Sequence, residues 1–284
     1  MRIVIASGKG GTGKTTVATN LALAVRNRNH RVTLIDCDVE EPNAHLFIKP
    51  VIEVSYEVGI PVPEIDFELC DYCGLCAERC AFNALAVIKD NVLVFDRICH
   101  GCGGCSYFCP NQAITETVRP IGVVEKGIRN GLGFIHGRLN PGEAMAPPLI
   151  NKTKAEIRSD DINIIDAPPG TSCPVVASLS NSDYCILVTE PTSFGLNDLD
   201  LAVQLTEKMG IKTGVVINRC DMGDDRIEDY CLKNGLEILM QIPWNRDFAV
   251  SYAGGDTVVG GRDSYWEKAF YELFQKIAGG LEVG

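Results

Sequence analysis

Short apolar runs separated by helical patterns recur along most of this 284-residue chain. The first run, residues 2–6 (RIVIA), ends in a glycine-rich turn, and residues 31–36 (RVTLID) follow after a helical segment. Apolar runs of this length that are bounded by turn residues indicate buried strands of a parallel sheet. Four later runs have the same character and begin at residues 161, 183, 212 and 236.

Helical periodicity fills the intervals between these runs. After the first run, apolar residues recur at helical spacing, among them Val17, Leu21, Ala24 and Val25. Further helices are expected near residues 194–210 and 224–234, and two more follow towards the end of the sequence. Strands that alternate with helices predict an α/β fold, a doubly wound and mostly parallel sheet with helices on both faces.

The last helical segment carries a single apolar stripe, formed by Trp266, Phe270, Leu273, Phe274 and Ile277. Such a stripe is typical of packing against a core, and the polar face mixes Glu with Lys, so membrane targeting is disfavoured. No apolar run reaches the length of about 18 residues that predicts a transmembrane helix. The first residues pass straight into a strand, which leaves no room for a signal peptide. We therefore expect a cytoplasmic protein without membrane insertion.

Residues 67–116 break the alternation and contain an internal repeat. The sequence CDYCGLCAERCAFNALAV, which begins at Cys70, is echoed 29 residues later by CHGCGGCSYFCPNQAITE. The flanking segments 51–66 and 117–150 alternate like strands and hold several Pro and Gly, so they predict stems that join an inserted unit to the main sheet. The predicted organisation is one α/β domain in two parts around the insertion: residues 1–66 and 117–284.

The second stem offers no further candidate site. His136 is expected in a glycine-rich hairpin with a structural or solvated role, because a lone histidine in such a setting rarely binds a ligand. Residues 143–150 (EAMAPPLI) are expected to form a turn with an apolar contact.

The formal net charge of −11 disfavours a nucleic-acid surface, because phosphate contacts need clustered Lys and Arg. The densest basic run, residues 26–31 (RNRNHR), lies at an expected helix end, where the helix dipole favours cations. The acidic balance suits solubility and a basic protein partner. We therefore expect no nucleic acid among the partners.

Cysteine usage is uneven. Eight of the thirteen cysteines lie between Cys70 and Cys109, and the other five stand alone. Disulfide frameworks belong to short secreted chains, so metal-bound thiolates in a reducing cytoplasm are the better interpretation. Each repeat has the spacing C-x2-C-x2-C-x3-C, in which three thiolates hold three corners of a cubane. The fourth cysteine is expected to begin a short helix and to ligate the other cluster.

This spacing predicts two 4Fe–4S clusters with crossed ligands. We expect one cluster on Cys70, Cys73, Cys76 and Cys109, and the second on Cys99, Cys102, Cys105 and Cys80. Zinc also binds four thiolates, but two triplets that are each followed by a fourth cysteine do not match a zinc-ribbon spacing. Cys109 precedes Pro110 whereas Cys80 precedes Ala81, so the two clusters are expected to differ in local geometry and potential.

Residues 8–15 (GKGGTGKT) match the phosphate-binding pattern G-x-x-x-x-G-K-[ST], placed between a strand and a helix. The glycines let successive backbone N–H groups face a phosphate, and the helix N-terminus adds partial positive charge. Lys14 is expected to reach the β- and γ-phosphates, and the Thr15 hydroxyl to ligate Mg²⁺. The loop predicted to bind ATP or ADP comprises Gly8, Gly10, Gly11, Thr12, Gly13, Lys14, Thr15 and Thr16.

Carboxylates follow two of the apolar runs. Asp36 and Asp38 end the run in LIDCDVEEPN, and Asp166 ends the run in INIIDAPPGTS. A lone Asp at a strand end is often only a cap, but carboxylates beside a phosphate loop can touch Mg²⁺ or its waters. Asp36 and Asp166 are therefore predicted to act on Mg²⁺ together with Thr15.

A second lysine, Lys9, lies inside the phosphate loop. With this feature the sequence resembles the deviant Walker A ATPases, which include MinD, ParA, the nitrogenase iron protein and the Mrp-type cluster carriers. With its insertion it looks like the MinD-superfamily ATPases that contain a two-cluster ferredoxin domain. The resemblance implies an ATP-dependent dimer, either of identical chains or with a paralogue, in which Lys9 reaches the partner's nucleotide. It also implies that Lys14 and Asp38 are catalytic, with Asp38 in the first switch positioning or activating the attacking water.

The same resemblance assigns roles farther along the chain. Asp166 would hold a Mg²⁺-bound water, and Gly170 would lie near the γ-phosphate in the second switch. In VVINRC, Asn218 would hydrogen-bond the adenine base, with Arg219 beside it. Residues 242–244 (IPW) either line the same pocket or pack in the core.

Three functions fit these motifs. The first is a Mg²⁺-dependent ATPase that couples nucleotide state to electron transfer through the two clusters, between redox proteins that the sequence does not identify. The second is an iron–sulfur cluster carrier or assembly ATPase; the Mrp-type proteins use a closely spaced cysteine pair, whereas ten residues separate Cys220 from Cys231. The third is a redox-sensing spatial organiser resembling MinD or ParA. We expect the first, because the insertion lies between the first switch and the Asp166 strand.

Overall fold

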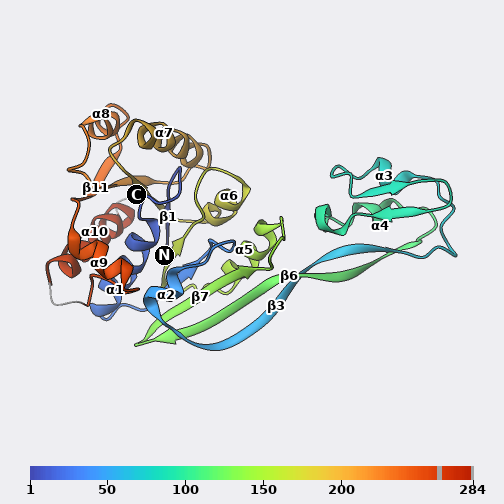
Figure 1. Ribbon diagram of the computed structural model, residues 1–284, viewed down its shortest axis with the longest axis horizontal. Helices are drawn as coiled ribbons and strands as arrows, with labels where there is room; N and C mark the ends of the chain where they lie inside the picture. Colours follow the sequence, from blue (N-terminus) through green and yellow to red (C-terminus); the bar gives the residue numbers. More distant parts are fainter. Residues whose placement is uncertain (261–263, 283–284) are drawn as a thin grey trace.

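The computed structural model describes residues 1–260 and 264–282. Nine strands form one sheet in the order β11-β10-β9-β1-β8-β2-β7-β6-β3, and the seven strands from β11 to β7 run parallel to one another (Figure 1). This arrangement confirms the predicted α/β fold with a mostly parallel sheet. Six of these parallel strands are β1 (Arg2–Ala6), β2 (Val32–Asp36), β8 (Ile162–Asp166), β9 (Tyr184–Thr189), β10 (Thr213–Asn218) and β11 (Glu237–Ile242).

Helices cover both faces of the sheet, because side chains of each parallel strand alternate between two apolar cores. In β1, Ile3 and Ile5 join one core, whereas Val4 and Ala6 join the other. The first core holds residues of α1 (Lys14–Asn27), α2 (Ala44–Ile48) and α10 (Ser264–Glu282). The second core holds residues of α5 (Ala146–Ala155), α6 (Cys173–Leu179), α7 (Ser193–Lys208) and α8 (Arg226–Lys233).

The apolar stripe of α10 packs against α1 and the sheet, as predicted. All five stripe residues are buried in the same core as Val17 and Leu21 of α1. Burying a large apolar side chain fully contributes about 1.5–3 kcal/mol each, so this stripe is a substantial part of the core on that face. No helix among the described residues is long and apolar enough to cross a bilayer.

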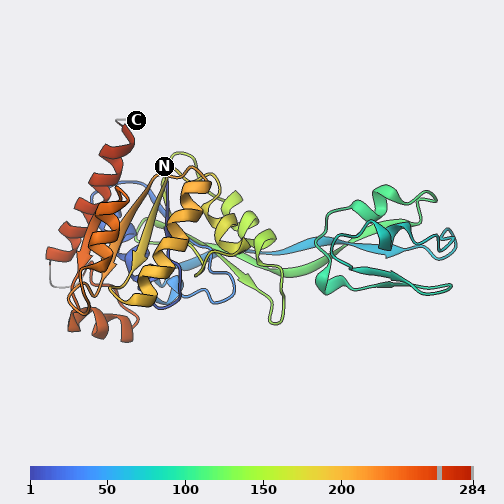
Figure 2. The same ribbon diagram turned by 90° about the horizontal axis from the view of Figure 1, so that it is seen from above.

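Three further strands follow β2 in the sheet: the first is parallel to β2, and the outer two are antiparallel to their neighbours. They are β7 (Leu132–Leu139), β6 (Ile114–Arg129) and β3 (Val51–Ile65). The inner halves of β3 and β6 lie in the sheet, and the outer halves continue as a two-stranded ribbon that projects from the molecule (Figures 1 and 2). A strand the length of β3 spans about 50 Å at about 3.4 Å per residue. The ribbon therefore carries the cysteine-rich insertion well away from the body of the sheet.

A β-bulge lies where the ribbon leaves the sheet. The register of β3 and β6 shifts between Val58 and Gly59. A Cβ atom added to Gly59 would lie 2.5 Å from Val118 Cγ1 and 2.7 Å from the Arg119 carbonyl oxygen, so only glycine fits. Beyond it, Pro61 and Pro63 remove backbone donors from an exposed edge, which protects the ribbon from pairing with other chains.

The cysteine-rich insertion folds at the tip of the ribbon as two similar halves (Figure 1). Each half holds a short helix that begins after a glycine with positive φ, Gly74 in one half and Gly103 in the other. Cys80 and Cys109 follow these helices and do not begin them, which corrects the sequence-based expectation. The elements are α3 (Leu75–Glu78), β4 (Leu85–Val87), β5 (Val92–Val94), η1 (Asp96–Ile98) and α4 (Gly104–Phe108).

One of the two expectations about the second stem was wrong. Residues 143–150 do not form only a turn, because α5 begins at Ala146, and its two prolines stand in the first helical turn, where no backbone donor is needed. His136, by contrast, lies in β7 of the β6–β7 hairpin and has a structural role, as predicted. Its buried ring hydrogen-bonds Glu125 of β6 through Nε2 at 2.8 Å, so it ties two neighbouring strands together.

Candidate functional site

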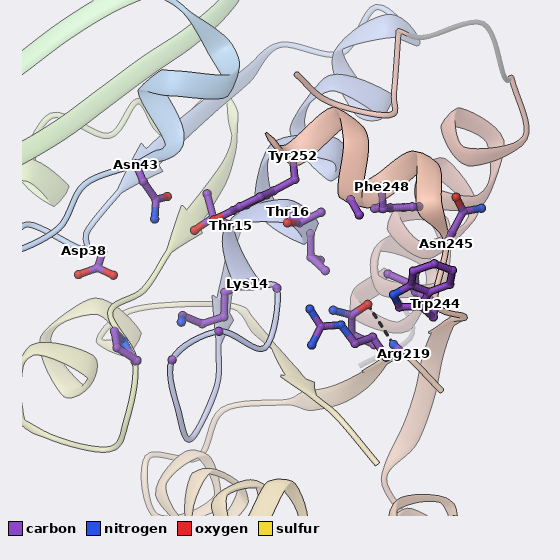
Figure 3. Close-up of a pocket in the computed structure, with 18 of the residues that line it drawn as sticks. Lys14, Thr15, Thr16, Asp38, Asn43, Arg219, Trp244, Asn245, Phe248 and Tyr252 are labelled. Carbon is purple, nitrogen blue, oxygen red and sulfur yellow. Dashed lines mark hydrogen bonds between the residues drawn. The ribbon is translucent and has the colours of Figure 1, made fainter. Parts of the chain in front are cut away.

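A cavity of about 460 Å³ opens at the carboxyl ends of the parallel strands (Figure 3). Loops that follow β1, β2, β8, β10 and β11 contribute to its walls, which is where open α/β sheets bind ligands. Its volume is typical of small-molecule sites. Predicted site residues that line it are Gly10, Gly11, Gly13, Lys14, Thr15, Thr16, Asp38, Asn218 and Arg219.

The glycine-rich loop forms the floor of the cavity at the N-terminus of α1. Gly11 and Gly13 have positive φ values of 79° and 97°, a conformation that side chains disfavour. A Cβ atom on Gly13 would lie 2.6 Å from Asn218 Nδ2, which donates a hydrogen bond to the Thr12 carbonyl oxygen at 2.9 Å. Asn218 therefore holds the loop in place as well as lining the cavity. Gly10 and Gly11 have open space where a Cβ would stand, so a phosphate can approach their backbone.

Three predicted residues sit behind this loop and do not line the cavity. Gly8 lets α7 approach closely, because an added Cβ would meet the Asp198 carbonyl oxygen at 2.1 Å. Thr12 is buried within the loop, and Gly170 donates its N–H to the Ser7 carbonyl oxygen at 3.0 Å. Gly170 thus lies beside the strand that leads into the phosphate loop, while its neighbour Pro169 reaches the cavity wall.

The carboxylates gather beside Lys14 and Thr15. The Thr15 hydroxyl donates to Asp166 Oδ2 at 2.6 Å, and Asp166 Oδ1 is buried without a hydrogen-bond partner among the described residues. Asp36 is paired in register with Asp166 on the adjacent strand. Its two oxygens accept backbone N–H groups of residues 38, 43 and 44 at 3.0–3.1 Å, so it also fixes the loop between β2 and α2.

Burial raises the pKa of all three carboxyl groups. The pKa of Asp38 rises to about 6 and that of Asp166 to about 7, although the nearby Lys14 ammonium opposes both shifts. The pKa of Asp36 is also well above its usual range, through burial and the charge of Asp166. Burial of these carboxyl groups disfavours their ionised forms, and a bound cation would favour them again. The site is therefore complementary to a cation.

These residues fit Mg²⁺ bound together with a nucleotide. Mg²⁺ usually keeps several waters and takes one or two protein oxygens plus substrate phosphates. The Thr15 hydroxyl and the unpartnered oxygen of Asp166 are suitable protein ligands or water holders. Across residues 1–260 and 264–282, no group of three or more His, Cys, Asp or Glu side chains is arranged to hold a metal ion by itself.

Nucleotide binding in the presence of Mg²⁺ is expected to strengthen with pH. Below about pH 7, Mg²⁺ must displace a proton from Asp166. One linked proton weakens binding up to about tenfold per pH unit, so we expect Mg-ADP to bind about tenfold more weakly at pH 6 than at pH 8. Calorimetric titration at both pH values measures this.

The control for that titration is ADP in excess chelator, which corrects for protonation of the nucleotide itself. In the absence of Mg²⁺, folding stability depends on pH in the opposite direction. Carboxyl groups whose pKa values are higher in the folded than in the unfolded chain stabilise the fold when they are protonated. That contribution is lost as the pH rises through about 6 to 7. Equal Mg-ADP affinity at both pH values after correction would mean that Asp166 does not act on the metal.

Aromatic side chains from the segment between β11 and the end of α9 line one wall of the cavity (Figure 3). Trp244 is held by its backbone N–H, which donates to Asp221 Oδ1 at 2.6 Å. Of the two interpretations of residues 242–244, lining the pocket is therefore correct, although Ile242 also packs in the core. Phe248 and Tyr252 of α9 (Arg246–Ala253) complete this wall, and the sequence patterns did not indicate them because helical periodicity alone does not show which side faces a ligand.

Lys9 and Arg219 meet on one carboxylate. Arg219 Nη1 donates to Glu190 Oε1 at 2.8 Å, and Lys9 Nζ lies 3.9 Å from Glu190 Oε2. Lys9 does not line the cavity of its own chain. Its reach towards a partner's nucleotide stays a prediction.

The cysteines of the insertion line two smaller cavities. The first, here the distal cavity, lies at the outer end of the ribbon beside Ile65 and Ile114; its cysteines are Cys70, Cys73, Cys76 and Cys109. The second, the proximal cavity, lies nearer the sheet beside Pro61 and Pro63; its cysteines are Cys80, Cys99, Cys102 and Cys105. Each cavity thus gathers three cysteines of one repeat and the fourth of the other.

The two fourth cysteines have equivalent surroundings. The N–H of Ala84 donates to Cys80 Sγ at 3.3 Å, and the N–H of Ala113 donates to Cys109 Sγ at 3.3 Å. In the proximal cavity, the N–H of Gly101 also donates to Cys99 Sγ at 3.4 Å. Backbone donors of this kind stabilise thiolate charge, and they tune iron–sulfur sites.

The fold and the cavity define a P-loop nucleotide-binding protein. Residues 3–258 match the CobQ/CobB/MinD/ParA nucleotide binding domain family, and the chain belongs to this family. An uncharacterised protein of Methanocaldococcus jannaschii is 34% identical over 262 residues, which cover 90% of this chain and 91% of that protein. An iron-sulfur cluster carrier protein of Pyrococcus horikoshii is 25% identical over 99% of this chain and 86% of its own length.

Solved structures agree on the fold. The cell division ATPase MinD of Pyrococcus furiosus superposes with a TM-score of 0.60 at 20% identity, covering 98% of both chains. At this identity the likeness concerns the fold alone.

Proposed function

We propose that this protein is a Mg²⁺-dependent ATPase that couples its nucleotide state to electron transfer through two 4Fe–4S clusters. The observation that carries the proposal is the pair of crossed four-cysteine cavities at the tip of a ribbon that is built into the nucleotide-binding sheet. The cysteine spacing and the crossing are those of ferredoxin-like two-cluster proteins. We interpret residues 67–116 as that inserted unit, between the two parts of the ATPase domain.

In the nucleotide site, the loop from Gly8 to Thr16 would bind the phosphates, with Lys14 neutralising the charge that develops on transfer. Thr15 and Asp166 would hold Mg²⁺ and its waters. Asp38 lines the cavity and has a pKa of about 6, so it is ionised at neutral pH and able to accept a proton from the attacking water. Lys9 would complete the site across an ATP-dependent dimer, of two identical chains or of this chain and a paralogue.

In the insertion, the thiol donor sets fit cubane clusters, because each cavity offers four cysteines and backbone N–H donors to the fourth sulfur. A cluster bound there would accept and release one electron. The two sites differ in the charged residues that line them: Asp71 lines the distal cavity, whereas Arg79 and Glu116 line the proximal one. The charges of Arg79 and Glu116 offset each other and that of Asp71 has no basic counterpart in its cavity, so the proximal site is the better electron acceptor of the two.

A second candidate function is delivery of iron–sulfur clusters, which the name of the Pyrococcus horikoshii relative favours. In that case the clusters would leave the protein during ATP turnover. Against it stands the absence of a late C-x-x-C pair in the sequence. A redox-sensing spatial organiser in the cytoplasm is a third candidate with the same ligands.

An anaerobic redox titration tests the proposal, performed with and without Mg-ATP on an Asp38→Ala variant in which hydrolysis is blocked. Coupling between sites is typically about 1–3 kcal/mol, and about 1.4 kcal/mol corresponds to roughly 59 mV for one electron. We expect a nucleotide-dependent shift of that order. Unchanged potentials, together with iron loss to an apo-ferredoxin during turnover of the unmodified protein, would instead establish cluster delivery.

A further inference from the structure

The segment between β7 and α5, residues 139–145, touches both the nucleotide site and the ribbon. We call this segment the connector. The N–H of Leu139 donates to the carbonyl oxygen of Val39 at 2.8 Å, and Val39 directly follows the cavity residue Asp38. The N–H of Asn140 donates to the carbonyl oxygen of Ile121 at 2.8 Å, in the part of β6 where the ribbon leaves the sheet. Adjacent residues of the connector therefore hold the predicted first switch and the base of the ribbon.

The connector also binds the ribbon through an ion pair between Glu143 and Arg119. Both guanidinium nitrogens Nη1 and Nη2 of Arg119 donate to the carboxylate of Glu143, and Nη2 lies 3.3 Å from Oε1. The Glu143 side chain is only 5% exposed, and its Oε1 also accepts the N–H groups of Ala144 and Met145. A bidentate ion pair of this kind fixes the relative orientation of the two side chains as well as their distance.

Arg119 lies on β6 opposite Ile60 of β3, next to Pro61, which lines the proximal cavity. The pKa of Arg119 is raised first by its hydrogen bond to Glu143, and also by the nearby Asp96 and Cys99, the latter a predicted cluster ligand. Its Nε is buried and has no hydrogen-bond partner among the residues that the structure describes. The N–H at Nε of Arg119 therefore remains available as a donor. Two of the groups that act on the charge of Arg119, Asp96 and Cys99, belong to the cysteine-rich unit.

The proximal loop is seated firmly on the same ribbon. A Cβ atom added to Gly101 would lie 2.9 Å from the Pro61 carbonyl oxygen, which shows how closely the Cys99–Cys102 loop packs on β3. The distal cavity lies farther from Arg119 along the ribbon, because its ribbon neighbours are Ile65 and Ile114 at the outer end. A displacement of Arg119 would consequently act on the proximal site first.

Helix α5 provides a second attachment to the nucleotide site. Lys154 Nζ donates to the carbonyl oxygens of residues 177, 178 and 180 at 2.6–2.7 Å, at the end of α6. Helix α6 follows the predicted second switch at Gly170. The connector and α5 thus join both predicted switches to the ribbon as one packed element.

We propose that Glu143 and Arg119 are positioning residues that transmit the nucleotide state from the first switch to the proximal cluster site. This inference rests on the proposed function. When the loop after Asp38 changes with the bound nucleotide, Val39 moves the connector, and Glu143 moves the Arg119 guanidinium relative to Cys99. The guanidinium charge then stabilises the reduced proximal cluster to a different extent, while the distal cluster is affected much less.

The test measures how strongly redox state changes nucleotide affinity. The dissociation constant of Mg-ADP is determined anaerobically for the oxidised and the dithionite-reduced holoprotein. In the unmodified protein we expect the two constants to differ by about 5- to 150-fold, the usual range of coupling between sites. In Glu143→Gln, which keeps the side-chain volume but loses the charge, we expect a difference below about twofold with unchanged iron content.

The matched control is Glu156→Gln, at the other end of α5. Glu156 pairs with Lys126 of β6 and accepts a hydrogen bond from Tyr56 of β3. Both partners belong to the inner halves of these strands, which lie in the sheet. This variant should keep the affinity ratio of the unmodified protein. If Glu143→Gln also keeps that ratio, the connector inference is wrong. If the unmodified protein shows no ratio at all, the proposed coupling itself fails.

A measurement that needs no cluster keeps the inference testable if a variant loses iron. Hydrogen–deuterium exchange of the cluster-free chain reports on the connector amides of Leu139 and Asn140 with and without Mg-ADP. We expect nucleotide to change their exchange rates in both the unmodified chain and Glu143→Gln, but to change exchange of Arg119 only in the former. Nucleotide-dependent exchange at Arg119 in the variant would overturn the transmitting role of Glu143.

Discussion

Replacing Cys109 with serine is expected to remove the distal cluster, even though Cys109 belongs to the second repeat. Cys109 lines the cavity that also holds Cys70, Cys73 and Cys76, and the N–H of Ala113 holds its sulfur in place. The same reasoning assigns Cys80 to the proximal cluster. Serine is a poor iron ligand in place of a thiolate, so iron should fall from about eight to about four atoms per chain in either variant.

Double variants distinguish crossed from uncrossed ligation without any spectral assignment. Under crossed ligation, Cys73→Ser combined with Cys109→Ser removes one cluster, because both residues serve the same site. Cys73→Ser combined with Cys80→Ser removes both clusters. Iron and sulfide analysis, with electron paramagnetic resonance of the reduced protein, measures the outcome. Cys220→Ser, outside the insertion, is the control and should retain all iron.

The opposite pattern would refute the crossed arrangement. If the Cys73 and Cys109 pair lost all iron while the Cys73 and Cys80 pair lost half, each repeat would bind its own cluster. Equal loss in both pairs would indicate that the two sites fold only together. Circular dichroism of the sheet core separates that case from global unfolding, since among the described residues the insertion adds only Ala84 and Cys99, with Cys80 packed against them, to the main cores.

Much of this architecture follows from local patterns in the sequence. Unbroken apolar runs correctly predicted strands such as β1 and β8, because a strand covered on both faces needs apolar residues at every position. The α10 stripe was predicted because its apolar residues repeat at helical spacing. The cysteine spacing predicted which thiols share a cavity, because short loops leave few arrangements for three consecutive ligands.

Other features depend on contacts that have no period in the sequence. The start of α5 was missed because its two prolines resemble a turn, yet the first helical turn needs no donors there. The ion pair between Arg119 and Glu143 joins residues that are 24 positions apart on different elements. No local sequence pattern marks either residue. The aromatic wall from α9 was likewise invisible, because the helix reaches the cavity only through packing of the whole sheet.

Replacing Asp38 with asparagine is expected to lower ATP hydrolysis by about 10²- to 10⁴-fold while leaving nucleotide binding nearly unchanged. Asp38 lines the cavity beside Lys14, and its pKa of about 6 leaves it ionised at neutral pH. Asparagine keeps the shape and hydrogen-bonding capacity but cannot accept a proton, and loss of a general base costs a factor in that range. Phosphate release gives the rate, and calorimetry with Mg-ADP gives the affinity.

Glu41→Gln is the matched control, because Glu41 stands in the same loop, lines the same cavity and also carries a carboxylate. Its hydrolysis rate should stay within a few-fold of the unmodified protein. A pH profile adds an independent readout: hydrolysis by the unmodified protein should rise through about pH 6 and then level off, because the base acts only when ionised. If Asp38→Asn instead weakens Mg-ADP binding as much as it slows hydrolysis, Asp38 serves the metal rather than the water, and the base must be sought elsewhere, such as across the dimer.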